Sequence, residues 1–375
     1  MRRVALLAAL LLAPLAALAE DCPSPASGED HWAVAAPADV GLDGATLCAI
    51  GPRFTEWKQA NIHAVLVARH GRLAFEHYFS GADEDWGRSI GTVQFDPDVK
   101  HDVRSVTKSV TALLLGIAIG RGLVPGVDAP VLSLLPDYAD LKTEAKQRIT
   151  LRHLLTMSAG LAWDENIPYS DSANSEIRMD FAADPYRYVL ERPVDAPPGH
   201  RYNYSGGSAA LISAVLHKAT GKTEDVLAQD MLFAPLGITD VSWARYPGNG
   251  DPIAASGLRM RPRDMAKLGQ LVLNHGRWNE QQIVPEAWLE ESMAPHIQGS
   301  QLYFYGYQWW LGRSLVGGRP TDWEAGVGLG GQRVFIVPAL DLVVVTTAGL
   351  YKSEMQAWVP LQILNRYVLD AVQAQ

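Results

Sequence analysis

Cysteine is scarce in this sequence, with only Cys22 and Cys48 among its 375 residues. Two cysteines exclude a disulfide-rich scaffold and a four-cysteine zinc site. The ten histidines form no His-Glu-x-x-His motif, which is the ligand spacing of many zinc hydrolases. The sequence therefore predicts a protein that uses neither a metal nor another cofactor.

Clusters of basic residues are missing as well. The 32 Lys and Arg residues are outnumbered by 41 Asp and Glu residues, and the formal net charge is −9. A protein that binds nucleic acid typically presents a basic patch to the phosphates. These counts argue against nucleic acid as a partner.

No apolar run is long enough to span a bilayer, which takes ~20 residues. The run at residues 4–19 follows Arg2-Arg3 and ends in Ala17-Leu18-Ala19, the order of a signal peptide cleaved after Ala19. Glu20-Asp21 lie where a lipid-modified cysteine needs small neighbours. We expect a periplasmic or secreted protein without a membrane anchor, in which the two cysteines form a disulfide.

Strand patterns occur near the two ends of the chain and helical patterns lie between them. Apolar and β-branched residues predict one hairpin over residues 64–79 and another over 333–347. Helical patterns cover 105–120, 151–157 and 207–220, and 358–372 is predicted to be a closing helix. The length favours two lobes. We expect an α/β lobe from residues 20–100 and 251–375, and a mostly helical lobe from 101–250 inserted into it.

The first candidate catalytic motif is Ser105-Val106-Thr107-Lys108, at the start of the apolar segment 105–120. Residues at i and i+3 of a helix share one face, so the serine and lysine side chains can form a hydrogen bond. Burial of the lysine disfavours its charged form, which would make it a base for the serine hydroxyl. Ser-x-x-Lys is frequent by chance, and its weight depends on partners elsewhere in the chain.

Two further motifs supply such partners. Tyr204 lies in Pro198-Gly199-His200-Arg201-Tyr202-Asn203-Tyr204-Ser205, on a turn before a helix, where its hydroxyl could relay a proton. The glycines of Gly326-Val327-Gly328-Leu329-Gly330-Gly331-Gln332 fit G-x-G-x-x-G but lead into a strand, whereas a dinucleotide fingerprint opens a helix. Glycines before a strand instead leave a backbone N–H free to face an oxyanion.

In this order and spacing, the three motifs resemble the serine β-lactamase-related superfamily, and the branch of class C β-lactamase-like esterases and 6-aminohexanoate-dimer hydrolases in particular. The resemblance implies an α+β fold in which helices flank an antiparallel sheet and a mostly helical lobe is inserted. It implies that Ser105 is the nucleophile, Lys108 its proton partner and Tyr204 the general base or acid. The backbone N–H groups of Ser105 and Gln332 would form the oxyanion hole.

Two departures from class C enzymes bear on the substrate. Tyr204 is followed by Ser205-Gly206, so the asparagine of Tyr-x-Asn is missing, and Leu329 stands where the lysine of Lys-Thr-Gly would be. Without that cation, pairing with a β-lactam or peptide carboxylate weakens by about 1.5 to 3 kcal/mol. We therefore expect an esterase or amidase for small, uncharged substrates. Leu329 and two aromatic residues, Trp163 and Trp323, are the candidates for substrate binding.

Other functions remain open at this stage. One is a β-lactamase or a D-Ala-D-Ala peptidase. Another is a non-catalytic penicillin-binding or sensing module. The chain lacks Gly-x-Ser-x-Gly, which argues against the nucleophile elbow of α/β-hydrolases. The sequence motifs indicate no particular oligomeric state.

Overall fold

The computed structural model describes residues 22–28 and 32–373. The predicted signal peptide, residues 1–19, lies outside the described residues. Among the described residues, no helix combines the length and the apolar character needed to cross a membrane. The two cysteines form the expected disulfide, with the Cα atoms of Cys22 and Cys48 5.6 Å apart.

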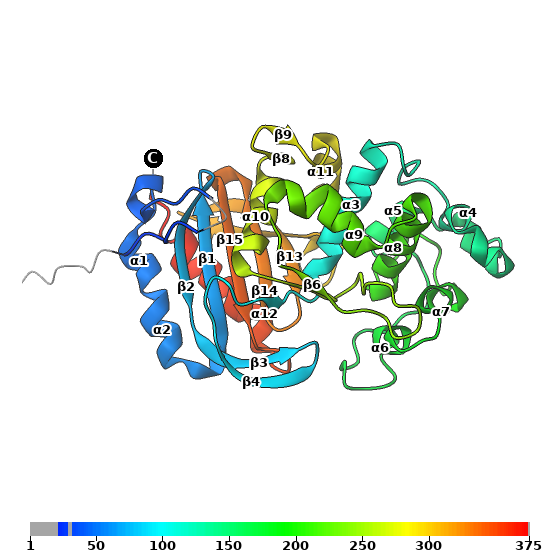
Figure 1. The fold of residues 1–375 in the computed structure, drawn as a ribbon, viewed down its shortest axis with the longest axis horizontal. Coiled ribbons are helices and arrows are strands. Elements are labelled where there is room, and N and C mark those ends of the chain that lie inside the picture. Colours follow the sequence, from blue (N-terminus) through cyan, green and yellow to red (C-terminus); the bar gives the residue numbers. More distant parts are fainter. Residues whose placement is uncertain (1–21, 29–31, 374–375) are drawn as a thin grey trace, which may run out of the picture.

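An eight-stranded antiparallel sheet is the centre of one lobe (Figure 1). The N-terminal strand β1 pairs with the C-terminal strand β15, so the two hairpins predicted at opposite ends of the chain belong to one sheet. The strand order is β10-β11-β12-β13-β14-β15-β1-β2. The bounds are Ile297–Gln298, Phe304–Tyr305, Trp310–Val316, Arg319–Gly328, Gln332–Val337, Leu342–Ala348, Ile62–Arg69 and Arg72–Tyr78, respectively.

Every residue of β1 is buried because helices cover both faces of the sheet. Since side chains alternate along a strand, Leu66 packs into the core under α10 while Val65 and Val67 pack into the opposite core. Helix α10, Pro262–Leu273, covers the first face. The second face is covered by α1 (Gly44–Cys48), α2 (Ile50–Glu56), α12 (Met355–Ile363) and the π-helical segment Leu364–Leu369. These last two form the predicted closing helix.

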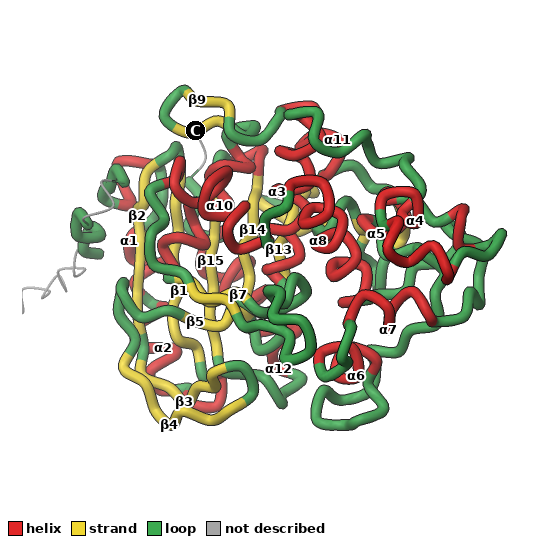
Figure 2. Tube along the Cα trace, turned by 45° about the vertical axis from the view of Figure 1, so that its right-hand side comes forward, coloured by secondary structure: helices red, strands yellow, loops and turns green. Residues whose placement is uncertain are grey.

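Most of the remaining helices group beyond one edge of the sheet (Figure 2). Helix α3, Val106–Gly120, lies between this group and the sheet, and its residues 106–118 are all buried. It packs against α8 on one side and β13 on the other, which explains why its sequence is apolar all round. The other helices are α4 (Val131–Leu134), α5 (Leu151–Leu155), α6 (Ser175–Asp180), α7 (Pro185–Glu191), α8 (Gly206–Thr220), α9 (Glu224–Ala228) and α11 (Glu286–Ser292).

Short strands complete the fold. Strand β5 (His101–Asp102) pairs with β7 (Leu258–Met260), which also pairs with β6 (Ser242–Trp243). The segment 101–250, expected to be mostly helical, therefore contains β5 and β6 near its two ends. The remaining strands are β3 (Ser80–Asp85), β4 (Arg88–Gln94), β8 (Arg277–Trp278) and β9 (Gln281–Gln282). Irregular helical turns cover Pro37–Val40, Lys58–Ala60, Pro136–Leu141, Lys146–Arg148, Gln229–Phe233, Ala234–Leu236 and Pro338–Leu340.

Candidate active site

Ser105 occupies the position just before α3, where the chain leaves β5 and turns into the helix. The residue before it, Arg104, has a φ of 50°, a left-handed conformation that is unfavourable for a residue with a Cβ atom. Strain of this kind persists only where the surroundings hold it. Here the turn aims the Ser105 hydroxyl into a cavity at the N-terminal end of α3.

Lys108 lies one helical turn further on and is 1% exposed. Its Nζ atom donates to Ser105 Oγ at 3.0 Å and to the Ala255 carbonyl at 2.9 Å, and lies 3.8 Å from Glu176 Oε2. The i and i+3 spacing thus brings serine and lysine together.

The charge of Lys108 differs from the sequence-based expectation. Burial lowers the pKa of Lys108, but the Glu176 carboxylate and Tyr204 outweigh burial and raise that pKa above its usual value. Lys108 is therefore an ammonium ion at neutral pH, not the neutral base that desolvation alone would give.

Tyr204 comes from the turn before α8, and its ring faces the same ammonium group. Lys108 Nζ lies 4.9 Å from the centroid of the Tyr204 ring. Burial raises the pKa of Tyr204, whereas Lys108 and a hydrogen bond with Ser105 lower it, and the balance lies above the usual value. Tyr204 is therefore a neutral phenol at rest, in contact with both of the other side chains.

Three acidic residues that the motifs do not contain complete the surroundings of Lys108. Glu176 and Asp180 lie on α6, four residues apart, and Glu165 lies on the loop before this helix. Burial and the Glu176 charge raise the pKa values of Glu165 and Asp180 well above the usual range. Although burial opposes it, the ammonium of Lys108 lowers the pKa of Glu176. Glu176 is thus the carboxylate that pairs with the Lys108 ammonium, whereas the ionised forms of the other two acids are disfavoured.

Hydrogen bonds hold two of these carboxyl groups, those of Glu165 and Glu176. Glu165 accepts hydrogen bonds from the Gly206 N–H, from Trp163 Nε1 and from the Tyr169 hydroxyl, the last at 3.0 Å. Ser256 Oγ donates to Glu176 Oε1 at 3.1 Å. A Cβ atom at Gly206 would lie 2.2 Å from Glu176 Oε2, so this glycine is required by close packing. The i and i+4 spacing of Glu176 and Asp180 is the sequence signal that could have indicated this acidic face.

The cavity in front of Ser105 has a volume of about 330 Å³, within the range of small-molecule sites. Apolar side chains contribute much of its wall, namely Trp86, Ile177, Phe181 and Leu329. Arg104 is the one Lys or Arg among the residues that line it, and its guanidinium lies 3.2 Å from Asp102 Oδ2. The cavity wall therefore combines apolar side chains with the carboxyl groups of Glu176 and Asp180, and the cation that lines it is already paired.

Of the three predicted substrate-binding residues, only Leu329 lines this cavity. Trp163 lies behind it, where its indole N–H is bound to Glu165 and its ring packs edge-on against Tyr188 at 6.2 Å. Trp323 is on β13, donates to Ser314 Oγ at 3.1 Å and packs against Phe335. The structure thus places both tryptophans in the packing of the protein and not in the wall of this cavity.

Of the two predicted oxyanion donors, Ser105 is among the residues that line the cavity, as is Leu329. Gln332 is 0% exposed and is not among them. The side-chain amide of Gln332 links the carbonyls of Leu329 and Ala348, and so it supports the turn. No described residue accepts a hydrogen bond from the N–H of Ser105 or of Leu329.

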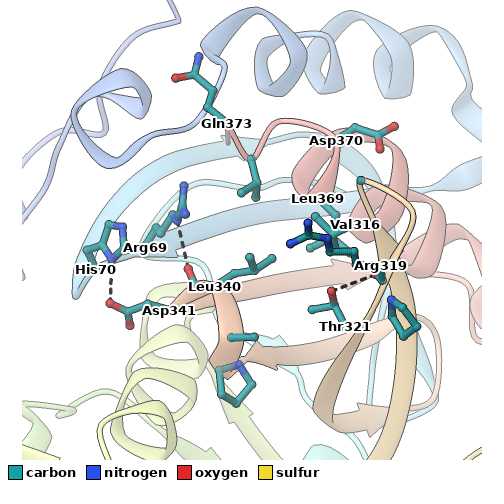
Figure 3. A pocket seen from close by; sticks show the side chains of 15 residues that line it. Arg69, His70, Val316, Arg319, Thr321, Leu340, Asp341, Leu369, Asp370 and Gln373 are labelled. Carbon is teal, nitrogen blue, oxygen red and sulfur yellow. Dashed lines mark hydrogen bonds and ion pairs between the residues drawn. The ribbon is translucent and has the colours of Figure 1, made fainter. Parts of the chain in front are cut away.

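A larger hollow, of about 1030 Å³, lies on a different part of the surface, beside the turns that join β1 to β2 and β14 to β15 (Figure 3). Several of its polar groups contact one another: Arg69 Nε donates to the Leu340 carbonyl at 3.1 Å, and His70 lies 2.8 Å from Asp341. It contains no nucleophile with a base beside it. The cavity in front of Ser105 is therefore the candidate active site.

Comparisons with known proteins agree with this fold. The 6-aminohexanoate-dimer hydrolase of Paenarthrobacter ureafaciens is 23% identical over 318 residues, which cover 80% of this chain and 75% of that protein. Esterase EstB of Burkholderia gladioli is 28% identical over 186 residues, covering 47% of this chain and 45% of the esterase. The solved structure of EstCE1, described as a hydrolase with promiscuous acyltransferase activity, has a TM-score of 0.64 at 17% identity. The structural match covers 97% of the EstCE1 chain and 84% of this chain.

A family model also matches a long continuous part of the chain. The family model described as Beta-lactamase matches residues 58–357, which include all three sequence motifs and the acidic residues around Lys108. The matched region is far more than half of the chain. The chain therefore belongs to the Beta-lactamase family.

Proposed function

We propose that this protein is a serine hydrolase that cleaves small, uncharged esters or amides through an acyl-enzyme formed on Ser105. The observation that supports this most directly is the contact of Ser105 Oγ with Lys108 Nζ at 3.0 Å, beside Tyr204 and at the mouth of an apolar cavity. A serine hydroxyl held in contact with titratable side chains that can manage its proton is typical of covalent catalysis.

In the proposed acylation step, Ser105 Oγ attacks the carbonyl carbon and its proton passes to Tyr204 Oη. Tyr204 accepts it as a phenolate, which forms when the resting phenol loses its proton to solvent and which the Lys108 ammonium stabilises. Collapse of the tetrahedral intermediate breaks the bond to the alcohol or amine, and Tyr204 returns the proton to that leaving group. Water then attacks the acyl-enzyme by the same route in reverse and releases the acid.

The backbone N–H groups of Ser105 and Leu329 are the proposed oxyanion donors. Both residues line the cavity, and both N–H groups are without an acceptor among the described residues. Leu329 is proposed in place of Gln332, which is buried and is not among the residues that line the cavity. Loss of one such donor typically lowers turnover by about 10²- to 10³-fold.

The nature of the cavity wall supports an uncharged substrate. Leu329 and Phe181 are apolar, Asp102 pairs with Arg104, and the Lys108 ammonium is occupied by Glu176, Ser105 and Ala255. A substrate carboxylate would meet no free cation at the cavity wall. The same chemistry disfavours β-lactams and peptides with a terminal carboxylate.

The test compares short-chain p-nitrophenyl esters, a linear amide and nitrocefin with wild-type protein, Ser105→Ala and Ser109→Ala. Ser109 is the matched control, because it lies on the same helix and donates to the Gln308 carbonyl at 2.8 Å. Hydrolysis of esters or the amide should vanish in Ser105→Ala, persist in Ser109→Ala and exceed nitrocefin hydrolysis. Mass spectrometry should find the acyl adduct on Ser105.

Several outcomes would count against the proposal. Ester hydrolysis that survives Ser105→Ala contradicts the assigned nucleophile. Faster hydrolysis of nitrocefin than of esters contradicts the substrate class and favours a β-lactamase. Covalent labelling of Ser105 without turnover favours a penicillin-binding or sensing module instead.

A further inference from the structure

Two imidazoles and a carboxylate meet in the interior of the protein, apart from the catalytic side chains. His63 is on β1, Asp83 on β3 and His101 on β5, and all three are at most 3% exposed. His63 Nδ1 and His101 Nε2 are 2.8 Å apart, and Asp83 Oδ1 lies 3.9 Å from the first and 3.4 Å from the second. Two ring nitrogens and one carboxylate oxygen, from three different strands, thus lie within 3.9 Å of one another.

The hydrogen bonds of the outer ring nitrogens fix the tautomers of both histidines. His101 Nδ1 is 2.9 Å from the carbonyl of Asp102, which can only accept, so this nitrogen carries the hydrogen. Asn61 donates from Nδ2 to the Ala82 carbonyl at 2.9 Å and therefore turns Oδ1 toward His63 Nε2, 3.3 Å away. His63 Nε2 is then a donor as well. In the neutral imidazoles, both inner nitrogens present lone pairs to each other.

Two lone pairs at 2.8 Å repel unless a cation lies between them or beside them. The three distances define a triangle whose centre is about 2.0 Å from each atom, the length of a zinc bond to imidazole or carboxylate. The outer N–H groups bound to a carbonyl and an amide oxygen are the supporting contacts usual for histidines that bind metals.

Asp83 can provide more than one donor atom. Oδ1 accepts a hydrogen bond from the Tyr351 hydroxyl at 2.8 Å. Oδ2 is buried and has no hydrogen-bond partner among the described residues. A buried carboxylate oxygen without a partner is costly, and coordination of a cation in a bidentate manner would satisfy it.

We propose that His63, Asp83 and His101 bind one zinc ion, held by two imidazole nitrogens and the carboxylate of Asp83. Nitrogen and oxygen donors in this number suit zinc among the common divalent ions, while calcium and magnesium favour sites made of oxygen alone. The ligands are enclosed, so the ion is taken up as the chain folds. The site joins β1, β3 and β5, which are far apart in the sequence.

The proposed ion would position the active site without touching the substrate. His101 is four residues before Ser105. On the other side, the Tyr351 hydroxyl donates to Asp83, and the Tyr351 ring packs against Gly330, the residue after Leu329. A Cβ atom at Gly330 would lie 2.6 Å from this ring. The three ligands are therefore positioning residues.

The test measures metal in untagged full-length protein produced in zinc-supplemented medium and purified without chelators. Inductively coupled plasma mass spectrometry should find one zinc ion per chain in the wild type and none in the Asp83→Asn and His101→Gln variants. His275→Gln is the matched control, because the His275 side chain is 67% exposed and outside the cluster, and it should keep the full zinc content.

Cobalt gives a second measurement that does not depend on any variant. Wild-type protein produced in cobalt-supplemented medium should show the visible absorption bands of a four-coordinate Co²⁺ site. Wild-type protein without zinc and without these bands would overturn the proposal, and a proton shared by the two histidines would then explain their approach. Zinc that remains in folded Asp83→Asn and His101→Gln would place the ion elsewhere and would also overturn it.

Discussion

The protonation of Lys108 depends on a residue that no catalytic motif contains. Glu176 supplies the negative charge that overcomes the effect of burial on the pKa of Lys108. The proposed base, the Tyr204 phenolate, is reached only by loss of a proton from the Lys108 and Tyr204 pair. Because the pKa values of both groups are raised, this loss occurs at alkaline pH.

We predict that kcat/KM of the wild type increases with pH, by about tenfold per unit where a single proton is lost. In Glu176→Gln the counter-charge is gone, so the pKa values of Lys108 and Tyr204 both fall. The rise in kcat/KM should therefore begin at lower pH. A pH–rate profile of ester hydrolysis measures this, with Glu144→Gln at an exposed site as the control. If the pH–rate profile of Glu176→Gln is the same as that of the wild type, Glu176 does not control the pKa values of Lys108 and Tyr204.

Helix α3 follows the proposed nucleophile and packs against α8 on one side and β13 on the other, and this packing limits which residues its sequence can contain. Gly116 faces Trp288 of α11, and a Cβ atom at this position would lie 2.2 Å from the indole ring. The amphipathic pattern expected of a surface helix is missing because both α8 and β13 cover α3. Its apolar run and terminal glycines were enough to predict the helix, but not the identity of its neighbours.

Gly116→Ala should destabilise the protein, even though alanine is the better helix former by about 1 kcal/mol. Overpacking of this kind costs about 1 to 3 kcal/mol, so the net free energy of unfolding should fall. Denaturant unfolding measures the change. Gly299→Ala is the control, since the nearest atom to its added Cβ would be 3.4 Å away. Equal stability of Gly116→Ala and the wild type would show that Trp288 moves aside without cost.

At the scale of the whole molecule, the two ends of the chain are brought together. Strands β1 and β15 pair along their length, and the Asp43 N–H donates to the Ala371 carbonyl at 2.8 Å. The disulfide ties residue 22 to the end of α1, across 26 residues of sequence. This bond is remote from Ser105 in the fold, so it contributes to stability and not to the proposed chemistry.

Reduction of the disulfide should lower the free energy of unfolding by roughly 3 kcal/mol, because the unfolded chain regains the conformational entropy that closing a loop of this size removes. Ester hydrolysis by the folded protein should not change. Unfolding curves with and without dithiothreitol measure the difference. The doubly substituted Cys22→Ser, Cys48→Ser protein should match the reduced wild type and be insensitive to the reductant. A reductant effect that persists in this variant would have another origin.

The sequence alone determined the fold class, the family and the elements that contain the motifs. The α+β fold and the esterase and 6-aminohexanoate-dimer hydrolase relatives confirm these predictions. The family and fold could be predicted because the three motifs, in their order and spacing, resemble the serine β-lactamase-related superfamily. The placement of Ser105 and Lys108 could be predicted because their spacing puts both side chains on one helical face. The alternation of residues in the two hairpins likewise fixes which side chains share a face of the sheet.

Only the tertiary structure decided the charge of Lys108, the positions of Trp163 and Trp323, and the meeting of His63 with His101. Each depends on which distant elements pack together. A pKa value is set by burial and by charges brought from elsewhere in the chain, here from α6. Local spacing does not encode these contacts, because they form when long-range burial of apolar surface assembles the helices and strands.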